Sequence, residues 1–368
     1  MSQQEYPICG FVPSYILEAI ATSSTAPEES KSACKATLEH KHKCDAHRND
    51  TSSVPQTLQA SLSTANDTPG LQRRIYDCQG KDEFPKKPVR SEGGERTKDR
   101  QVTNCYDGFK ITYDFYSTVF GRKSLDGKGM PLLGYVHFKP DEDVVGYNNA
   151  YWDGQRNRMV FGDGDHIYFD YLTDSLDVIA HELSHGFVQY SSPLEYYEQA
   201  GALNESCADV FGCMVEQWHM RQSSDDADWN LGQTLFPVAF TGSALRTMKA
   251  GKAYAGDPVL RTDRQPKHMK DYYAGEDDGR GVHINSGIPN HAFYLAAKAI
   301  GGNSWEKAGQ VWYRTMTSGL IPYRCDFKTF AEATVKIAGE SFGDGDGAAV
   351  KKAILGAWVN VGVLTASD

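Results

Sequence analysis

The segment 181–185 reads H-E-L-S-H, and its residue types and spacing are those of half a zinc site. On a helix, His181 and His185 lie one turn apart on the same face, and Glu182 between them can act as a base. Apolar residues on both sides of the motif recur at helical spacing, so we expect a helix here. On its own, the motif is also compatible with an ordinary helix that carries two polar-face histidines.

A hydrolytic zinc ion needs three protein ligands and one open position for water, so a third ligand must come from another element. The segment 201–212 supplies one: if it is helical, Glu205 and Asp209 project from the same face. One carboxylate could ligate the metal while the other accepts a hydrogen bond from a ligating imidazole and fixes its tautomer. A solvated helix face is the alternative explanation of this pair.

Taken together, these residues resemble the zinc site of the thermolysin-type (gluzincin) metalloendopeptidases, and the chain is most similar to their protealysin branch. The resemblance runs from about residue 75 to the C-terminus, with a weaker match at 7–20. It implies zinc ligation by His181, His185 and Glu205, base catalysis by Glu182, and a hydrogen bond between His181 and Asp209.

Further segments extend the resemblance on both sides of the zinc motif. The segment 277–287 reads D-D-G-R-G-V-H-I-N-S-G, which implies that His283 binds the developing oxyanion and that Asp278 orients this histidine. Tyr196, nine residues before Glu205, matches the second oxyanion donor of the family. Taken singly, each of these residues could have an ordinary structural role, such as that of a histidine in a surface loop. Their order and spacing around the zinc motif favour a role in catalysis.

The same resemblance implies how a peptide is bound. The segment 147–152 resembles an edge strand that binds substrate in extended form, so Asn149 and the Ala150 backbone should pair with the peptide main chain. Arg246 should bind a substrate carbonyl. Apolar residues match the pocket for the residue after the scissile bond and predict cleavage before Leu, Phe, Ile or Val. These pocket residues, each of which could instead simply fill the core, are Phe169, Leu172, Val178 and Leu245.

The expected reaction is zinc-assisted hydrolysis of a peptide bond. A bound zinc ion lowers the pKa of its water toward ~7, and Glu182 would take a proton as that water attacks and pass it to the leaving amine. By analogy with other oxyanion holes, removing one donor costs roughly 10² to 10³ in rate.

Two other function classes compete with an endopeptidase. A zinc-binding regulatory protein without catalysis would lack the base or an oxyanion donor, whereas Glu182, His283 and Tyr196 are all present. An aminopeptidase of the gluzincin type would carry a G-x-M-E-N-like segment before the zinc motif, and the chain has no such segment. An endopeptidase therefore fits best.

Composition limits the class of protein and its partners. With 368 residues, 40% hydrophobic and 23% charged, the chain is globular and long enough for two or three units. A net charge of −10 argues against a nucleic-acid partner, and no apolar run could span a membrane. We expect a monomer that acts on peptides or proteins.

The N-terminus shows no basic region followed by a long apolar stretch, since Pro and Gly interrupt residues 7–17. We therefore expect no signal peptide, and a protein that is cytoplasmic or exported by a route the sequence does not reveal. Its eight cysteines would then be reduced, with Cys207 and Cys213 as small core residues.

The predicted fold class is α+β, in the two-lobe arrangement of the thermolysin-like proteases. Residues 71–198 should form a β-rich α/β lobe that carries the zinc helix, and residues 199–368 a mainly helical lobe, with the cleft between them. Short strands and turns are expected from about 72 to 170. Helical periodicity predicts helices at 290–300, 304–316 and 348–358.

Residues 1–70 are expected to be a propeptide that inhibits its own enzyme. The segment 12–20 resembles the P-P-Y-x-L start of protealysin-type propeptides, with Ser14 in place of the second proline. The polar stretch 21–70, including an insertion at 28–66, is expected to be largely disordered. Cleavage near 65–74 would release the mature enzyme.

Two further metal contacts are hypotheses. The Cys9 thiolate could occupy the open zinc position and hold the precursor inactive, or Cys9 could be a small packing residue. A second structural metal in the Cys34–His47 segment is a weaker alternative to a polar insertion, because the spacing matches no known zinc module.

The family also binds structural calcium, and Asp177, Glu216 and Asp228 fall at matching positions. Asn230 and Gln233 replace two further carboxylates. Because calcium affinity follows the charge of its ligands, the sequence predicts one calcium ion rather than two.

Overall fold

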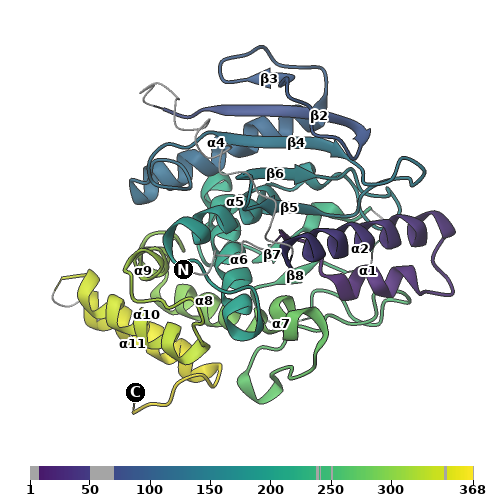
Figure 1. Ribbon diagram of the computed structural model, residues 1–368. Helices are drawn as coiled ribbons and strands as arrows, with labels where there is room; N and C mark the ends of the chain where they lie inside the picture. Colours follow the sequence, from purple (N-terminus) through teal and green to yellow (C-terminus); the bar gives the residue numbers. More distant parts are fainter. Residues whose placement is uncertain are drawn as a thin grey trace.

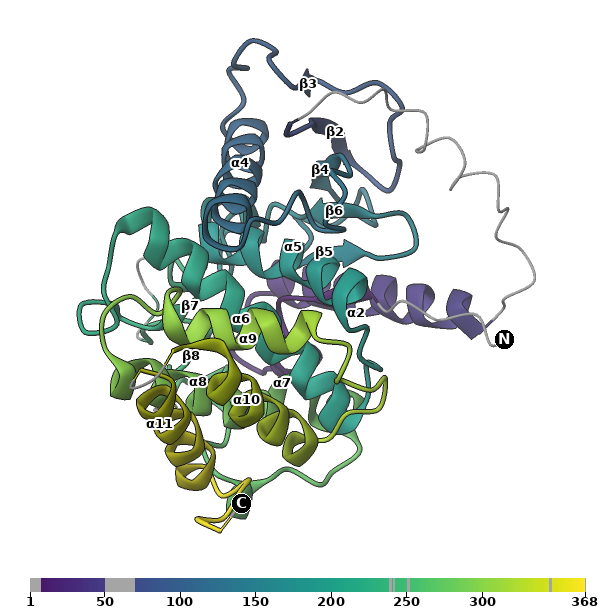
Figure 2. The ribbon, with the colours of Figure 1, turned by 90° about the vertical axis from the view of Figure 1, so that its left-hand side faces the viewer.

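The computed structural model describes residues 8–49, 70–237, 240, 242–249, 252–343 and 346–367, with the backbone alone for 8–9 and 45–49. Its elements form an N-terminal lobe with a twisted sheet and a C-terminal lobe of helices, which lies below the sheet in both views (Figures 1 and 2). This is the predicted division into an α/β lobe and a helical lobe.

The main sheet has six strands in the order β1-β5-β6-β4-β2-β3. β2, β4 and β6 are parallel to their sheet neighbours among these three, whereas β1, β3 and β5 pair antiparallel. The strand at one edge, β1, comes from the N-terminal segment and pairs with β5 of the lobe. The strands are β1 (Ile8–Gly10), β2 (Arg73–Lys81), β3 (Arg90–Ser91), β4 (Leu132–Phe138), β5 (Ala150–Asp153) and β6 (Arg158–Phe161).

The helical lobe contains the expected helices at 290–300, 304–316 and 348–358, which are confirmed as α8, α9 and α11. A two-stranded sheet of β7 and β8 also lies in this lobe. From residue 172 the elements are 3₁₀ helix η1 (Leu172–Asp174), α5 (Leu176–Ser191), α6 (Glu198–Met220), β7 (Asn230–Leu231), η2 (Gln233–Leu235), β8 (Arg246–Thr247), η3 (Met269–Asp271), α7 (Asp277–Asn285), α8 (Gly287–Ile300), α9 (Lys307–Thr317), α10 (Phe327–Ser341) and α11 (Asp346–Asn360).

The expectation of only strands and turns between 72 and 170 was wrong at α4 (Arg100–Phe120). The Asp99 side chain caps its N-terminus by accepting hydrogen bonds from the Gln101 and Val102 N–H groups, and Gly121 ends it in the left-handed conformation. Its buried face includes polar residues such as Thr112, so the apolar periodicity is diluted. The helix covers one face of the sheet and contacts α5.

The expectation that residues 21–70 are largely disordered was wrong for 28–49, which form α2 (Glu28–Asn49) after the short α1 (Ser14–Ala21). α2 lies beside β5 at the right of Figure 1. Its buried face combines small residues with polar ones and contains no large aliphatic side chain, which explains why hydrophobic periodicity does not reveal it; these residues are Ser30, Ala33, Cys34, Ala36, Thr37 and His40. Among its residues, Thr37 Oγ1 accepts a hydrogen bond from the Asn148 N–H (3.1 Å), and Asn148 Nδ2 donates to Cys34 Sγ (3.3 Å).

For the second-metal hypothesis, the helix brings Cys44 Sγ within 3.6 Å of His40 Nε2, but no described third ligand joins this pair. His40 packs among Phe138, Tyr147 and Tyr151, and its Nδ1 lies 3.3 Å from the Tyr147 hydroxyl. The side chain of His47 and residues 50–69, which include the first part of the expected processing region 65–74, lie outside what the structure describes.

α5 and α6 pack closely because Gly212 of α6 has no side chain. A Cβ placed there would lie 2.9 Å from the Asp177 carbonyl oxygen and 3.1 Å from the His181 nitrogen, both backbone atoms of α5. Since backbone moves less easily than a side chain, we expect Gly212→Ala to lower the free energy of unfolding by about 1–3 kcal/mol in denaturant titrations.

Gly356→Ala is the matched control, because a Cβ at this position of α11 meets no atom within 4 Å. Relief of glycine's backbone entropy should stabilise that helix by about 0.5–1 kcal/mol. If both variants were equally stable, the close approach of α5 and α6 would not limit residue size at 212.

His137, at the end of β4, is held between two carboxylates. Its Nδ1 lies 2.8 Å from Asp163 Oδ2 and its Nε2 lies 2.9 Å from Asp99 Oδ2. Burial alone would lower the pKa of His137, but the hydrogen bonds and charges of Asp163 and Asp99 raise it to about 9.

This pair of contacts predicts a pH-dependent contribution to stability. Because the folded pKa lies above that of free histidine (~6.5), the stabilisation is complete below pH ~6.5 and is lost as the pH rises through about 9. Wild type should therefore exceed His137→Gln most in free energy of unfolding at pH 6, and least at pH 10. A difference that stays constant between these pH values would contradict the charged state of His137.

Candidate active site and metal centre

His181 and His185 of α5 and Glu205 of α6 meet in the buried centre of the molecule. One ligand atom from each lies within 4.8 Å of the other two, and among the described residues this is the one group with metal-ligand composition. The two Nε2 atoms are 3.0 Å apart, and the Glu205 carboxylate oxygens lie 3.6 Å from His181 Nε2 and 3.5 Å from His185 Nε2. The structure thus brings the three predicted ligands together.

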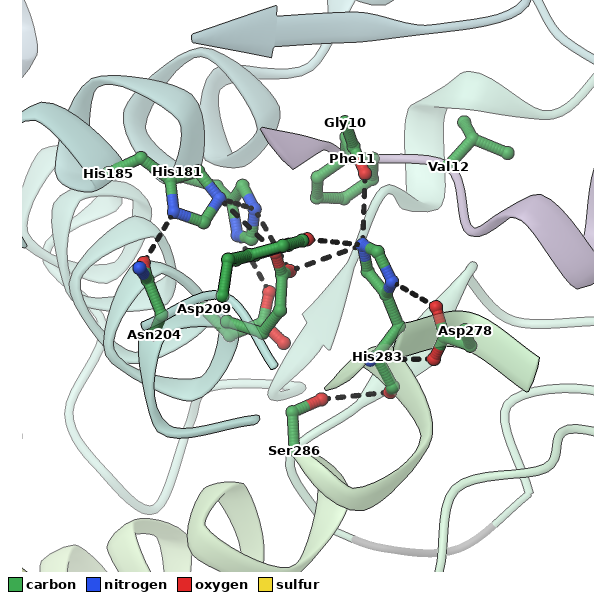
Figure 3. Close-up of polar contacts among 12 residues, drawn as sticks. Gly10, Phe11, Val12, His181, His185, Asn204, Asp209, Asp278, His283 and Ser286 are labelled. Atoms are coloured by element: carbon green, nitrogen blue, oxygen red, sulfur yellow. Dashed lines mark hydrogen bonds and ion pairs between the residues drawn. The ribbon is translucent and has the colours of Figure 1, made fainter. Parts of the chain in front are cut away.

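Two residues of α6 orient the imidazoles through their Nδ1 atoms. His181 Nδ1 lies 2.8 Å from Asp209 Oδ1, the predicted partner, and His185 Nδ1 lies 2.9 Å from Asn204 Oδ1 (Figure 3). Sequence reasoning missed Asn204, although its position directly before Glu205 could have suggested it. With each Nδ1 directed at an oxygen, both Nε2 lone pairs face the centre of the trio.

This donor set fits zinc. Two imidazoles and a carboxylate are a known catalytic zinc set, and the buried Glu205 Oε2 has no hydrogen-bond donor within the described residues. Burial lowers the pKa of His181 and of His185 to about 4, so both rings are neutral and can act as ligands. Two facing lone pairs 3.0 Å apart repel each other unless a cation lies between them.

Glu182 lies beside the trio and keeps one oxygen free. Its Oε2 accepts a hydrogen bond from the Trp152 N–H of β5 (2.8 Å), whereas Oε1 is buried without a partner in the described part of the chain. Burial raises the pKa of Glu182 well above its usual range, and the Glu205 charge adds to this. A divalent cation in the trio would act in the opposite direction and favour the carboxylate.

His283 and Tyr196 reach the same centre from the other side. His283 Nε2 lies 3.2 Å from the Tyr196 hydroxyl and 3.6 Å from Glu205 Oε2, and the Tyr196 hydroxyl donates to Glu205 Oε1. Burial alone would lower the pKa of His283, but the charges of Glu205 and Asp278 raise it. His283 Nε2 also lies 3.0 Å from the Gly10 carbonyl oxygen, which can only accept a hydrogen bond, so Nε2 is placed to donate, as an oxyanion contact requires.

A short left-handed turn at the start of α7 positions Asp278. Residues 278–281 have φ values of 58°, 57°, 61° and 86°, so two non-glycine residues adopt a conformation that favours glycine. The turn directs Asp278 onto His283, whose Nδ1 lies 2.6 Å from Oδ1 and whose backbone N–H donates to Oδ2 at 2.8 Å. The strained backbone of this turn therefore serves to hold the His283 imidazole in place.

Asp209 is the hub of a buried polar network. Its carboxylate accepts hydrogen bonds from Arg246 Nε and Nη2, each 2.9 Å long at its nearest oxygen, and from Asn290 Nδ2 at 2.8 Å. Although burial raises it, the pKa of Asp209 falls far below its usual range because of the charge of Arg246 and the hydrogen bond with His181. Asn290 is a further member that sequence reasoning missed.

The N-terminal segment lies across this centre. β1 continues into Phe11 and Val12, and the Phe11 N–H donates to the Ala150 carbonyl (3.1 Å). Asn149 bonds both main-chain groups of Val12: its Oδ1 accepts from the N–H (2.9 Å) and its Nδ2 donates to the carbonyl (3.0 Å). Arg246 Nη1 donates to the Phe11 carbonyl (2.9 Å). The residues predicted to bind a peptide backbone therefore bind this segment.

Phe11 is fully buried in the core cluster that contains the four predicted pocket residues, Phe169, Leu172, Val178 and Leu245. Its ring meets His181 edge-on, with centroids 5.0 Å apart, and a Cβ at Gly232 would come within 2.9 Å of it. Sequence reasoning missed Gly232, which leaves room for a large side chain in this pocket.

The predicted calcium residues do not form a comparable centre. Both oxygens of Asp177 are already engaged, because Oδ1 accepts from the Ser175 hydroxyl and the Val178 N–H, and Oδ2 accepts from the Gly232 N–H (2.6 Å). Neither Glu216 nor Asp228 joins Asp177 in a ligand group among the described residues. Burial and the charges of Asp177 and Asp228 nevertheless raise the pKa of Glu216 to about 9, so the three carboxylates lie near one another. Calcium stays a sequence-based prediction.

The structure describes the side chains of seven of the eight cysteines. All seven cysteines whose side chains are described are free thiols, and Cys207 and Cys213 are buried, as predicted. The backbone of Cys9 pairs with Trp152 in β1, but its side chain is outside the description, so the latency hypothesis for Cys9 stays a prediction. In the described chain, no helix combines the length and the apolar character that a membrane span would need.

Two family models cover most of the chain. Residues 36–189 match the catalytic domain of the thermolysin metallopeptidases, and residues 192–363 match the alpha-helical domain of the same metallopeptidases.

Individual proteins match over nearly the full length. An extracellular metalloprotease of Pectobacterium carotovorum subsp. carotovorum is 41% identical over 358 residues, 97% of each chain. The protease PrtS of a Photorhabdus strain is 42% identical over 360 residues, covering 96% of this chain and 92% of that protein. The solved precursor of protealysin, a metalloproteinase from Serratia proteamaculans, superposes with a TM-score of 0.83 at 39% identity, over 97% of this chain and all of that one.

Proposed function

The chain belongs to the thermolysin family of metallopeptidases, and from this premise we propose that it is a zinc endopeptidase that cleaves before bulky hydrophobic residues. The observation that carries the proposal is the buried Glu182, whose free oxygen adjoins the two-histidine, one-carboxylate group. A base without a partner beside a metal-ligand set has no structural purpose, and hydrolysis of a peptide bond gives it one.

His181, His185 and Glu205 would hold the zinc ion. When bound, zinc acidifies a water molecule and polarises the scissile carbonyl. Glu182 takes the proton of the attacking water and delivers it to the leaving nitrogen. His283 and Tyr196 donate hydrogen bonds to the oxygen that gains negative charge, and Asp278 holds His283 in its donating orientation.

Substrate recognition follows from the contacts of the N-terminal segment. Asn149, the Ala150 backbone and Arg246 would bind the main chain of an extended peptide, as they bind residues 11–12. A buried phenylalanine in the apolar pocket supports a preference for Phe, Leu, Ile or Val after the scissile bond.

The N-terminal segment itself would make the precursor inactive. A segment that fills the pocket and uses every main-chain contact leaves no room for a second peptide. We therefore propose that residues 8–21 act as an inhibitor until the propeptide is removed, and that the mature enzyme is a monomer with peptide and protein substrates.

The expectation of a protein that is cytoplasmic, or exported by a route the sequence does not reveal, was wrong. Relatives that match nearly the whole chain or about two thirds of it are named extracellular proteases. We propose that this protease is secreted as well and acts on proteins outside the cell. Buried free cysteines suit that environment, since a thiol without access to oxidants stays reduced.

The test of the proposed function is hydrolysis of a quenched peptide with Gly before and Leu after the scissile bond. Mature protein, obtained by processing of the full chain, should cleave the Gly-Leu bond, and a zinc chelator or Glu182→Gln should abolish cleavage. A matched peptide with Asp in place of Leu should be cleaved at least tenfold more slowly. Equal cleavage of both peptides would contradict the apolar pocket, and activity that survives the chelator would contradict the zinc.

A further inference from the structure

The N-terminal segment lies in the site with the direction and register of a substrate. β1 runs antiparallel to β5, with Cys9 opposite Trp152 and Gly10 opposite Tyr151. Three consecutive residues then meet three different parts of the site: the Gly10 carbonyl meets His283, the Phe11 carbonyl meets Arg246, and Val12 meets Asn149. A segment that merely plugged the pocket would not need all three contacts.

One peptide bond of this segment lies where the chemistry is. His283 Nε2 lies 3.0 Å from the Gly10 carbonyl oxygen, which is the contact proposed for the oxyanion (Figure 3). On the other side of the same bond, the Phe11 N–H donates to the Ala150 carbonyl oxygen of β5 (3.1 Å), and the Trp152 N–H of the same strand donates to Glu182 Oε2. One strand thus holds both the nitrogen that would leave and the carboxylate that would protonate it.

Both side chains flanking this bond suit cleavage. A Cβ at Gly10 would lie 2.7 Å from Asn149 Nδ2, so a residue with a side chain would not fit at position 10 while the bond lies this close to Asn149. The Phe11 ring is fully buried in the cluster that contains the residues assigned to the pocket for the residue after the scissile bond, and like Leu245 it lies against Gly232.

We propose that Gly10–Phe11 is a self-cleavage site, and that the zinc-loaded precursor hydrolyses this bond intramolecularly as the first step of its maturation. The inference rests on the proposed endopeptidase function. One water is added: its oxygen bonds to the Gly10 carbonyl carbon, the bond to the Phe11 nitrogen breaks, and Glu182 carries a water proton to that nitrogen. The products are a Gly10 carboxylate and a Phe11 ammonium group, which takes up the second proton of the water.

This cut alone would not release the inhibitor. Phe11, Val12 and α1 remain anchored by Arg246, Asn149 and the pocket, whereas residues before the cut lose their covalent tether. The cut precursor is thus a product complex that still blocks half of the site. A second cleavage, between α2 and β2, is needed to free the propeptide.

The test follows the full-length chain by intact mass and N-terminal sequencing. Protein purified in chelator receives zinc chloride, and a chain that begins at Phe11 should form before any chain that begins after α2. The first-order rate constant should stay the same over a hundredfold range of protein concentration. An apparent rate constant that rises with concentration, or maturation with the Gly10–Phe11 bond intact, would overturn the proposal.

Variants at Phe11 test the register. Phe11→Ala should slow the cut by roughly 10- to 200-fold, since an apolar side chain is lost from the pocket, and Phe11→Leu should restore it. Equal rates in both variants, or a cut displaced to a neighbouring bond, would contradict the register. Glu182→Gln should leave the full chain uncut.

A second readout does not depend on turnover. In full-length Glu182→Gln, hydrogen exchange of the Phe11 and Val12 amides should be slow, because both groups are bonded to the lobe, and Asn149→Ala should accelerate exchange at Val12 at least tenfold. Fast exchange in the parent variant would overturn the seating of the bond.

These outcomes separate the two proposals. Cleavage of the quenched peptide by processed protein, without a cut at Gly10–Phe11 in the precursor, would refute self-cleavage and leave the endopeptidase intact. Absence of both cleavages in zinc-loaded protein would refute the endopeptidase and the inference together.

Discussion

Glu182→Gln is expected to lower kcat by about 10⁴-fold while the zinc content stays at the wild-type level. Glutamine keeps the size of the side chain and can still accept the hydrogen bond from the Trp152 N–H, so the fold around β5 should persist. It cannot take a proton from water or deliver one to the leaving nitrogen. Peptide hydrolysis and metal analysis on the same purified sample measure the two quantities.

Glu332→Gln, an equivalent change on the exposed face of α10, is the control and should leave kcat unchanged. If Glu182→Gln kept more than a tenth of the activity, another group would have to be the base. If it lost zinc together with activity, the loss would report on metal binding rather than on proton transfer.

Asp209→Ala is expected to weaken zinc binding by roughly 10- to 100-fold and to lower the free energy of unfolding by about 3–5 kcal/mol. The first effect follows because His181 loses the carboxylate that orients its ring. The second follows because Arg246 is left as a buried, unpaired charge. Zinc-chelator competition and denaturant unfolding measure the two effects separately.

The double variant Asp209→Ala/Arg246→Met distinguishes these causes. It removes the unpaired charge, so it should regain a large part of the lost stability without regaining zinc affinity. If the double variant were as unstable as Asp209→Ala alone, the lost stability would not come from the charge of Arg246.

The residues of the zinc centre were predictable because short spacings in the sequence decide which residues share one face of a helix. Two residues four apart on one helix share a face whatever the rest of the fold does, so His181, His185 and the Glu205/Asp209 pair could be placed from spacing alone. Their mutual approach could not be derived in this way. It depends on the absence of a side chain at Gly212, which is recognisable only once α5 lies against α6.

Elements stabilised by polar contacts were the ones that periodicity missed. α2 buries three polar residues and three small ones against the lobe, a pattern that hydrophobic periodicity does not distinguish from a solvated helix face; they are Ser30, Thr37, His40, Ala33, Cys34 and Ala36. Asn204 and Asn290 each reach the site through one side-chain contact, to His185 and to Asp209 respectively, which are distant in sequence. Hydrophobic patterning carries no signal for such contacts, and the family resemblance transfers only the residues whose motifs it matches.

The position of β1 at the edge of the six-stranded sheet has a further consequence. Once the propeptide is gone, β5 becomes an open edge, and every substrate must join the sheet as its next strand. A stretch of chain can do so only if it is already free of its own hydrogen-bonding partners. The enzyme should therefore discriminate less by sequence than by the state of its target: it should digest loops, frayed ends and denatured proteins while it spares intact domains that contain the same hydrophobic residues.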